Sequence, residues 1–199
     1  MVKLMNQTIF IAKIKEKEIF LFSVSDVRVL FGLSSSTASK LLHRYSAKKL
    51  IIKFKRGLYA LSDAVPPEVY IANSLYRPSY LSREFALSFY GVIPETVYEY
   101  TSVTPKATRR FEREERIYSY RRIKKAVFTG YIMEKQGGFG FLIADPEKAL
   151  IDASYFRMRD GISPFSRINK EKINEQKALS YAGLYNDKKL VILIQSLLQ

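Results

Sequence analysis

The sequence contains no cysteine and a single histidine, His43. The absence of cysteine excludes disulfides, thiolate metal sites and a cysteine nucleophile. One histidine cannot form the histidine cluster of a zinc site, and without a partner it does not make a catalytic site. We therefore expect the protein to bind no metal and no cofactor.

Long apolar runs are also missing. The runs at residues 19–22 and 190–198 are far shorter than the roughly 20 apolar residues that a membrane-spanning helix needs. The N-terminus lacks the pattern of a signal peptide. These features predict a cytoplasmic protein without a membrane partner.

Acidic residues are few relative to basic ones. The chain has 33 lysines and arginines against 19 acids, a formal net charge of +14, and its 47% hydrophobic content is enough for a packed core. An excess this large attracts polyanions such as DNA, RNA or an anionic membrane surface. Residues 1–64 alone hold 12 of the basic and 4 of the acidic residues, so we expect the polyanion to bind there.

The adjacent prolines Pro66 and Pro67 interrupt helix and central strand alike, which is typical of a linker. The sequence therefore predicts two domains, at residues 1–64 and 68–199. In the first, the pattern predicts a helix over residues 4–15 and a short strand at 19–22.

Two further helices are predicted in the first domain. One begins after Ser25 as N-cap and ends at Phe31, and the next begins after Ser34 as N-cap. Along this last helix, four apolar residues recur at the spacing of one buried face: Ala38, Leu41, Leu42 and Tyr45. Hydroxyl and basic residues occupy the opposite side. The segment 50–61 then alternates apolar and basic residues around a turn at Arg56-Gly57, which indicates a two-stranded hairpin.

Helix, short turn, helix and β-ribbon is the order of the winged helix-turn-helix, whose second helix enters the major groove of DNA. Hydroxyls at a helix N-terminus also suit phosphate contacts. The alternative is that the hydroxyls only cap the helix and the charges form a solvated face. Fold plan, charge excess and cationic turn agree, so we predict a DNA-binding site formed by Ser35, Ser36, Thr37, Lys40, His43, Arg44, Lys53, Lys55 and Arg56.

The second domain is predicted to be a mixed α and β unit, which makes the protein α+β. Strands are expected at residues 97–104, 109–123, 127–135 and 139–144. Helices are expected after Ser82 and after Asp145, the latter with Pro146 in its first turn, and over residues 169–182 and 187–198.

Two groups of charged residues in this domain allow more than one interpretation. The basic residues could contact nucleic acid or a phosphate, or could form a solvated rim: Arg109, Arg110, Arg121, Arg122, Lys124 and Lys125. Asp145, Glu147 and Asp152 could bind a metal, but helix capping accounts for carboxylates at the first two positions. We therefore predict no catalytic residue and no enzyme.

The stretches at residues 80–111, 118–131 and 145–152, following a winged helix, resemble the AbiEi antitoxin family of type IV toxin–antitoxin systems. The resemblance covers about residues 20–156. It implies a transcriptional repressor of its own operon that binds an operator with inverted repeats. It also implies an antitoxin-type second domain that opposes a nucleotidyltransferase-type toxin without necessarily binding it.

Two alternatives to an antitoxin remain. The chain could be an enzyme that processes nucleic acid or nucleotides, with the basic clusters holding the substrate and the acids a metal. It could also be a plain winged-helix regulator without a toxin partner.

Overall fold

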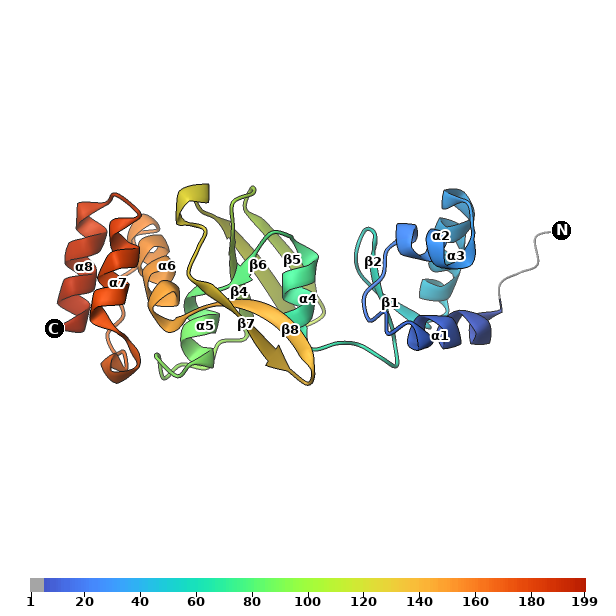
Figure 1. The fold of residues 1–199 in the computed structure, drawn as a ribbon, viewed down its shortest axis with the longest axis horizontal. Helices are drawn as coiled ribbons and strands as arrows, with labels where there is room; N and C mark the ends of the chain where they lie inside the picture. Colours follow the sequence, from blue (N-terminus) through green and yellow to red (C-terminus); the bar gives the residue numbers. More distant parts are fainter. Residues whose placement is uncertain (1–5) are drawn as a thin grey trace. The chain divides into compact units, whose positions relative to one another are not determined.

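The computed structural model describes residues 6–199, which divide into two compact units, one ending at residue 71 and the other spanning residues 72–199 (Figure 1). The division falls inside helix α4, Glu68–Leu75, which begins directly after Pro66 and Pro67. Helices and strands both build the chain, so the predicted α+β class is confirmed.

Besides the start of α4, the described residues of the first unit form three helices and a two-stranded antiparallel hairpin. The elements are α1 (Gln7–Glu16), α2 (Val24–Phe31), α3 (Ser35–Ala47), β1 (Ile51–Lys55) and β2 (Leu58–Leu61). All five contribute to one hydrophobic core, whose buried residues are Phe10, Ile14, Phe22, Val27, Ala38, Leu41, Leu42, Tyr45, Ile51 and Leu61.

Helix α2 has a different N-cap from the predicted one. Ser23 rather than Ser25 caps it: the Ser23 hydroxyl accepts from the backbone N–H of Asp26 at 3.2 Å, and the Asp26 carboxylate accepts from the backbone N–H of Ser23 at 2.7 Å. This reciprocal capping box requires the acid three residues after the cap. Asp26 therefore selects Ser23.

The segment before α2 is also not the strand that the sequence predicts. Only Phe22 pairs with the hairpin, through an isolated antiparallel bridge to Tyr59 with two hydrogen bonds of 2.9 Å. Phe22 is fully buried, so packing rather than a strand ladder holds this segment. The predicted helix over 4–15 begins at Gln7, and its residues 4 and 5 lie outside the described residues.

The second unit is built on a six-stranded mixed sheet with the order β5-β6-β4-β3-β8-β7. The pairs β4–β6 and β3–β8 are parallel and the other neighbours antiparallel. The strands are β3 (Tyr80–Leu81), β4 (Glu99–Thr104), β5 (Arg109–Arg113), β6 (Arg116–Arg122), β7 (Tyr131–Gln136) and β8 (Phe139–Ala144).

Two predicted strands take another form. The stretch 109–123 is a hairpin of β5 and β6, because the chain reverses at Glu114, which has a left-handed φ of 52°. The stretch 127–135 becomes a strand only from Tyr131, after a short 3₁₀ helix at Lys125–Val127.

Four helices accompany the sheet: α5 (Arg83–Phe89), α6 (Pro146–Arg159), α7 (Glu175–Gly183) and α8 (Lys188–Leu198). Figure 1 shows α6, α7 and α8 packed side by side. Helix α6 begins after Asp145 as predicted, and every residue from 147 to 154 is buried. A 3₁₀ helix at Lys170–Lys172 precedes α7, so the predicted helix over 169–182 is interrupted.

Among residues 6–199, no helix combines the length and the hydrophobicity needed to cross a bilayer.

Candidate nucleic-acid interface

Helix α3 separates a buried face from a polar one. The four residues predicted for the apolar stripe are buried, with Leu41 the most exposed of them at 5%. On the other side Ser35, Ser36, Lys40 and His43 are exposed, while Thr37 and Arg44 are half-buried. The polar face is therefore open to solvent within the first unit.

The N-terminal turn of α3 carries a small network of hydroxyls. The Ser34 hydroxyl accepts from the backbone N–H of Thr37 at 3.2 Å, which confirms the predicted N-cap. The same oxygen lies 3.0 Å from the Ser36 hydroxyl and 2.8 Å from the Thr37 hydroxyl. The first turn contains no acid, so the positive end of the helix dipole and its amides suit an anion.

Arg44 is held in place by the core below it. Its guanidinium lies 5.2 Å from the centre of the Tyr45 ring, and Tyr45 packs edge-on against Phe10 at 5.0 Å between ring centres. A cation over an aromatic ring gains electrostatic stabilisation. The Arg44 charge is thus positioned at the border of the polar face.

The hairpin presents further cations. The strands pair Lys53 with Tyr59 and Lys55 with Leu58, with an irregularity between the two pairs. Lys53 and Arg56 are exposed and Lys55 is half-buried. The hairpin turns at Arg56 and Gly57. Gly57 has a φ of +80°, a backbone conformation that glycine adopts without strain.

Between residues 27 and 62 the first unit has three exposed cations that the sequence prediction missed: Arg28, Lys48 and Lys49. A simple signal was available, since residues 27–62 contain eight lysines and arginines and no Asp or Glu. Helix α3 and the hairpin therefore lie in an acid-free stretch of the chain.

The six basic residues predicted in the second unit do not form one free cationic surface. Arg110 donates to Glu112 at 2.7 Å, and Arg121 holds both oxygens of Asp160 at 2.7 and 2.9 Å. This pairing keeps the pKa of Asp160 below its usual range. Arg109, Arg122, Lys124 and Lys125 are exposed.

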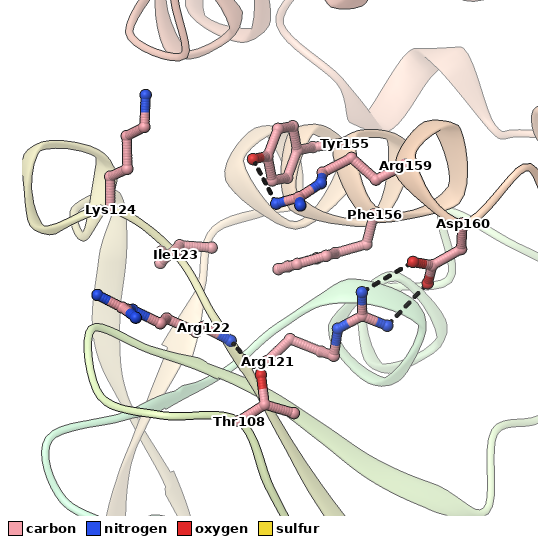
Figure 2. A pocket seen from close by; sticks show the side chains of 9 residues that line it. All are labelled: Thr108, Arg121, Arg122, Ile123, Lys124, Tyr155, Phe156, Arg159 and Asp160. Atoms are coloured by element: carbon pink, nitrogen blue, oxygen red, sulfur yellow. Dashed lines mark hydrogen bonds and ion pairs between the residues drawn. The ribbon is translucent and has the colours of Figure 1, made fainter.

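Three of these six residues line a hollow in the second unit (Figure 2). Its volume is about 490 Å³. Figure 2 shows side chains of α6 on one side and residues of β6 and the following segment on the other. The lining consists of Thr108, Arg121, Arg122, Ile123, Lys124, Tyr155, Phe156, Arg159 and Asp160.

The three carboxylates considered for a metal have protein partners instead. Asp145 accepts from the backbone N–H of Lys148 at 2.8 Å as the cap of α6, and Glu147 accepts from Lys177 at 2.8 Å. Asp152 is fully buried and bonded to the Lys148 ammonium. Within residues 6–199, no group of three or more metal-ligating side chains could hold an ion.

No model of a known protein family matches the chain, and no curated protein matches it.

Proposed function

We propose that the protein is a DNA-binding transcriptional autorepressor and antitoxin of a type IV toxin–antitoxin operon, acting in the cytoplasm. The observation that carries DNA binding is the polar face of α3, which is exposed opposite a fully packed apolar stripe. In this proposal the first unit is a winged helix-turn-helix, with α3 as the recognition helix and the β1–β2 hairpin as the wing.

In the proposed complex, helix α3 and the β1–β2 hairpin contact different parts of the DNA. The first turn of α3 meets base edges and phosphate through Ser35, Ser36 and Thr37, because recognition helices read bases with their N-terminal residues. Lys40, His43 and Arg44 continue the contact along the groove, and the hairpin cations contact the adjacent backbone. The acid-free stretch from residue 27 to residue 62 supports this, since a carboxylate there would repel phosphate.

The antitoxin part of the proposal rests on the resemblance of residues 80–111, 118–131 and 145–152 to the AbiEi family. It assigns to the second unit the activity that opposes a nucleotidyltransferase-type toxin, without requiring the two proteins to bind. Coexpression with the neighbouring operon product tests it, because an antitoxin relieves the growth arrest that the toxin causes and a plain regulator does not.

The test of DNA binding is a charge reversal on α3. In a mobility-shift assay with the DNA upstream of the protein's own gene, Lys40→Glu with Arg44→Glu should weaken binding at least about a hundredfold, since two attractive contacts become repulsive. Lys40→Glu alone should weaken it by a smaller factor. Far-UV circular dichroism checks that the variants remain folded.

A matched control is available in the second unit. Lys188→Glu with Lys189→Glu changes the net charge by the same amount at two exposed positions in the first turn of α8, where acids are favourable. This control should bind the operator nearly as well as the unchanged protein. Equal losses in the two double variants would mean that only net charge matters and that α3 is not the recognition helix.

A further inference from the structure

The side chains that line the hollow beside α6 carry more positive than negative charge. Four cations and one acid line it, and that acid, Asp160, is already held at both oxygens by Arg121. Arg122 and Lys124 are exposed, and neither side chain has a hydrogen-bond or ion-pair partner among the described residues. A net charge of this sign in a concave site attracts an anion.

Besides the paired Arg121, one more cation of the hollow has a structural role, which distinguishes it from Arg122 and Lys124. Arg159 stands in the last turn of α6, where the helix dipole favours a cation, and it donates to the Tyr155 hydroxyl at 3.1 Å. No such role applies to Arg122 and Lys124, which come from the end of β6 and the segment after it. Their positive charge is available to a ligand.

Aromatic side chains also take part in the lining of the hollow. Ile123 and Phe156 are buried, and the Tyr155 ring is fixed by Phe156 at 5.2 Å and Tyr185 at 4.7 Å between ring centres. The guanidinium of Arg121 lies over the Phe156 ring at 4.5 Å. Arg121 therefore covers Phe156, whereas Tyr155 is half-buried. The Tyr155 ring gives a planar base or a sugar something to pack on, which a bare phosphate does not need.

We infer that this hollow binds a nucleotide, with the positive charges of Arg122 and Lys124 attracting its phosphate and Tyr155 beside the base or ribose. Arginine and lysine are the side chains that recognise phosphate, arginine through paired hydrogen bonds. A volume of about 490 Å³ lies in the range of small-molecule sites. The nucleotide can be free or can be the 5′ end of an RNA strand.

A duplex DNA backbone fits the hollow less well. A duplex backbone would also contact exposed cations outside the hollow. Arg109 and Lys125 are such cations, because they are exposed and do not line the hollow. The affinity of a ligand confined to the hollow should depend on Arg122 and Lys124 and should not depend on Arg109 and Lys125. The inference is also independent of DNA binding by the first unit, whose test changes only α3.

Isothermal titration calorimetry of the full chain with AMP, ATP and inorganic phosphate tests the inference at low salt. We expect AMP or ATP to bind more tightly than phosphate, and Arg122→Ala with Lys124→Ala to weaken that binding at least about tenfold. The control, Arg109→Ala with Lys125→Ala, should bind as the unchanged protein does. Tighter binding of a 5′-phosphorylated RNA tetramer than of its unphosphorylated form, lost in the same variant, would identify an RNA end as the source.

Three results would overturn the inference. One is the absence of heat with every nucleotide probe, and another is phosphate binding as tight as that of AMP and ATP. The third is an equal loss in the hollow variant and its control, which would mean that the cations act only as diffuse surface charge.

Discussion

Lys148 and Asp152 form an ion pair one turn apart on α6, and both side chains are wholly buried. The Asp152 carboxylate also accepts hydrogen bonds from the hydroxyls of Tyr80, Ser82 and Tyr185, and the Lys148 ammonium also donates to Tyr185 at 2.8 Å. The carboxylate thus has four donors and the ammonium two acceptors. This network connects α6 to β3, to the start of α5 and to the turn after α7 around a buried pair of charges.

The unequal sharing of partners predicts unequal costs of mutation. Asp152→Ala should destabilise the second unit by about 3–5 kcal/mol, because it leaves a buried ammonium with one neutral acceptor. Lys148→Met should cost less, because three hydroxyls still donate to the carboxylate. Hydrogen exchange of the α6 amides, followed by mass spectrometry, measures both losses in the full chain. Equal losses would contradict the asymmetry.

Structural features that depend on residues close together in the sequence could be predicted. The buried face of α3 follows from the spacing of Ala38, Leu41, Leu42 and Tyr45, and its N-cap from the hydroxyl of Ser34. The N-cap of α2 was misplaced by two residues because Ser23 and Ser25 are equivalent until the carboxylate of Asp26 is taken into account.

Contacts between residues far apart in the sequence could not be predicted in this way. The partners Tyr80, Ser82 and Tyr185 lie 72, 70 and 33 residues from Asp152, so a local pattern gives Asp152 no role. In the same way Arg121 was grouped with its basic neighbours, whereas it pairs with Asp160, 39 residues away. Both residues line the hollow, which could not be predicted either.

Two adjacent serines at the start of α3 should behave differently. Ser34→Ala should destabilise the first unit by about 1 kcal/mol, because it removes the hydroxyl that caps the helix. Ser35→Ala should leave stability nearly unchanged, since Ser35 is exposed, and should weaken operator binding if it contacts DNA. Urea denaturation and mobility shift of the two variants separate the roles. A loss of stability in Ser35→Ala as large as in Ser34→Ala would refute this assignment.

The contact between α6 and α7 should weaken in acid. Burial alone would raise the pKa of Glu147, but hydrogen bonds from Lys177 and from the Asn174 backbone N–H outweigh it and hold the pKa below its ordinary value of 4.5. A lowered folded-state pKa stabilises the fold above the unfolded value, and the contribution is lost as the pH falls through the folded value. Thermal unfolding should therefore show a loss of stability below about pH 4.5.

Glu147→Gln isolates this carboxylate from the others that titrate in the same range. The variant should melt at a lower temperature than the unchanged protein at pH 7, and the difference should shrink as the pH is lowered to 3, because the glutamate becomes increasingly protonated. A difference that stays constant between the two pH values would show that the charge of Glu147 does not stabilise the fold.

The salt dependence of operator binding should report the hairpin contacts separately from those of α3. Each phosphate contact adds about 0.9 to the slope of log K against log salt. Lys53 is an exposed hairpin cation that the proposal assigns to the DNA backbone. Lys53→Ala should therefore lower the slope by about one per bound copy and weaken binding to all DNA sequences alike.

Ser36→Ala, in the first turn of α3, should instead change the preference between operator variants and leave the slope unaltered. Filter binding from 50 to 200 mM salt measures both, and a sequence-dependent effect of Lys53→Ala would place the hairpin on the bases rather than on the backbone.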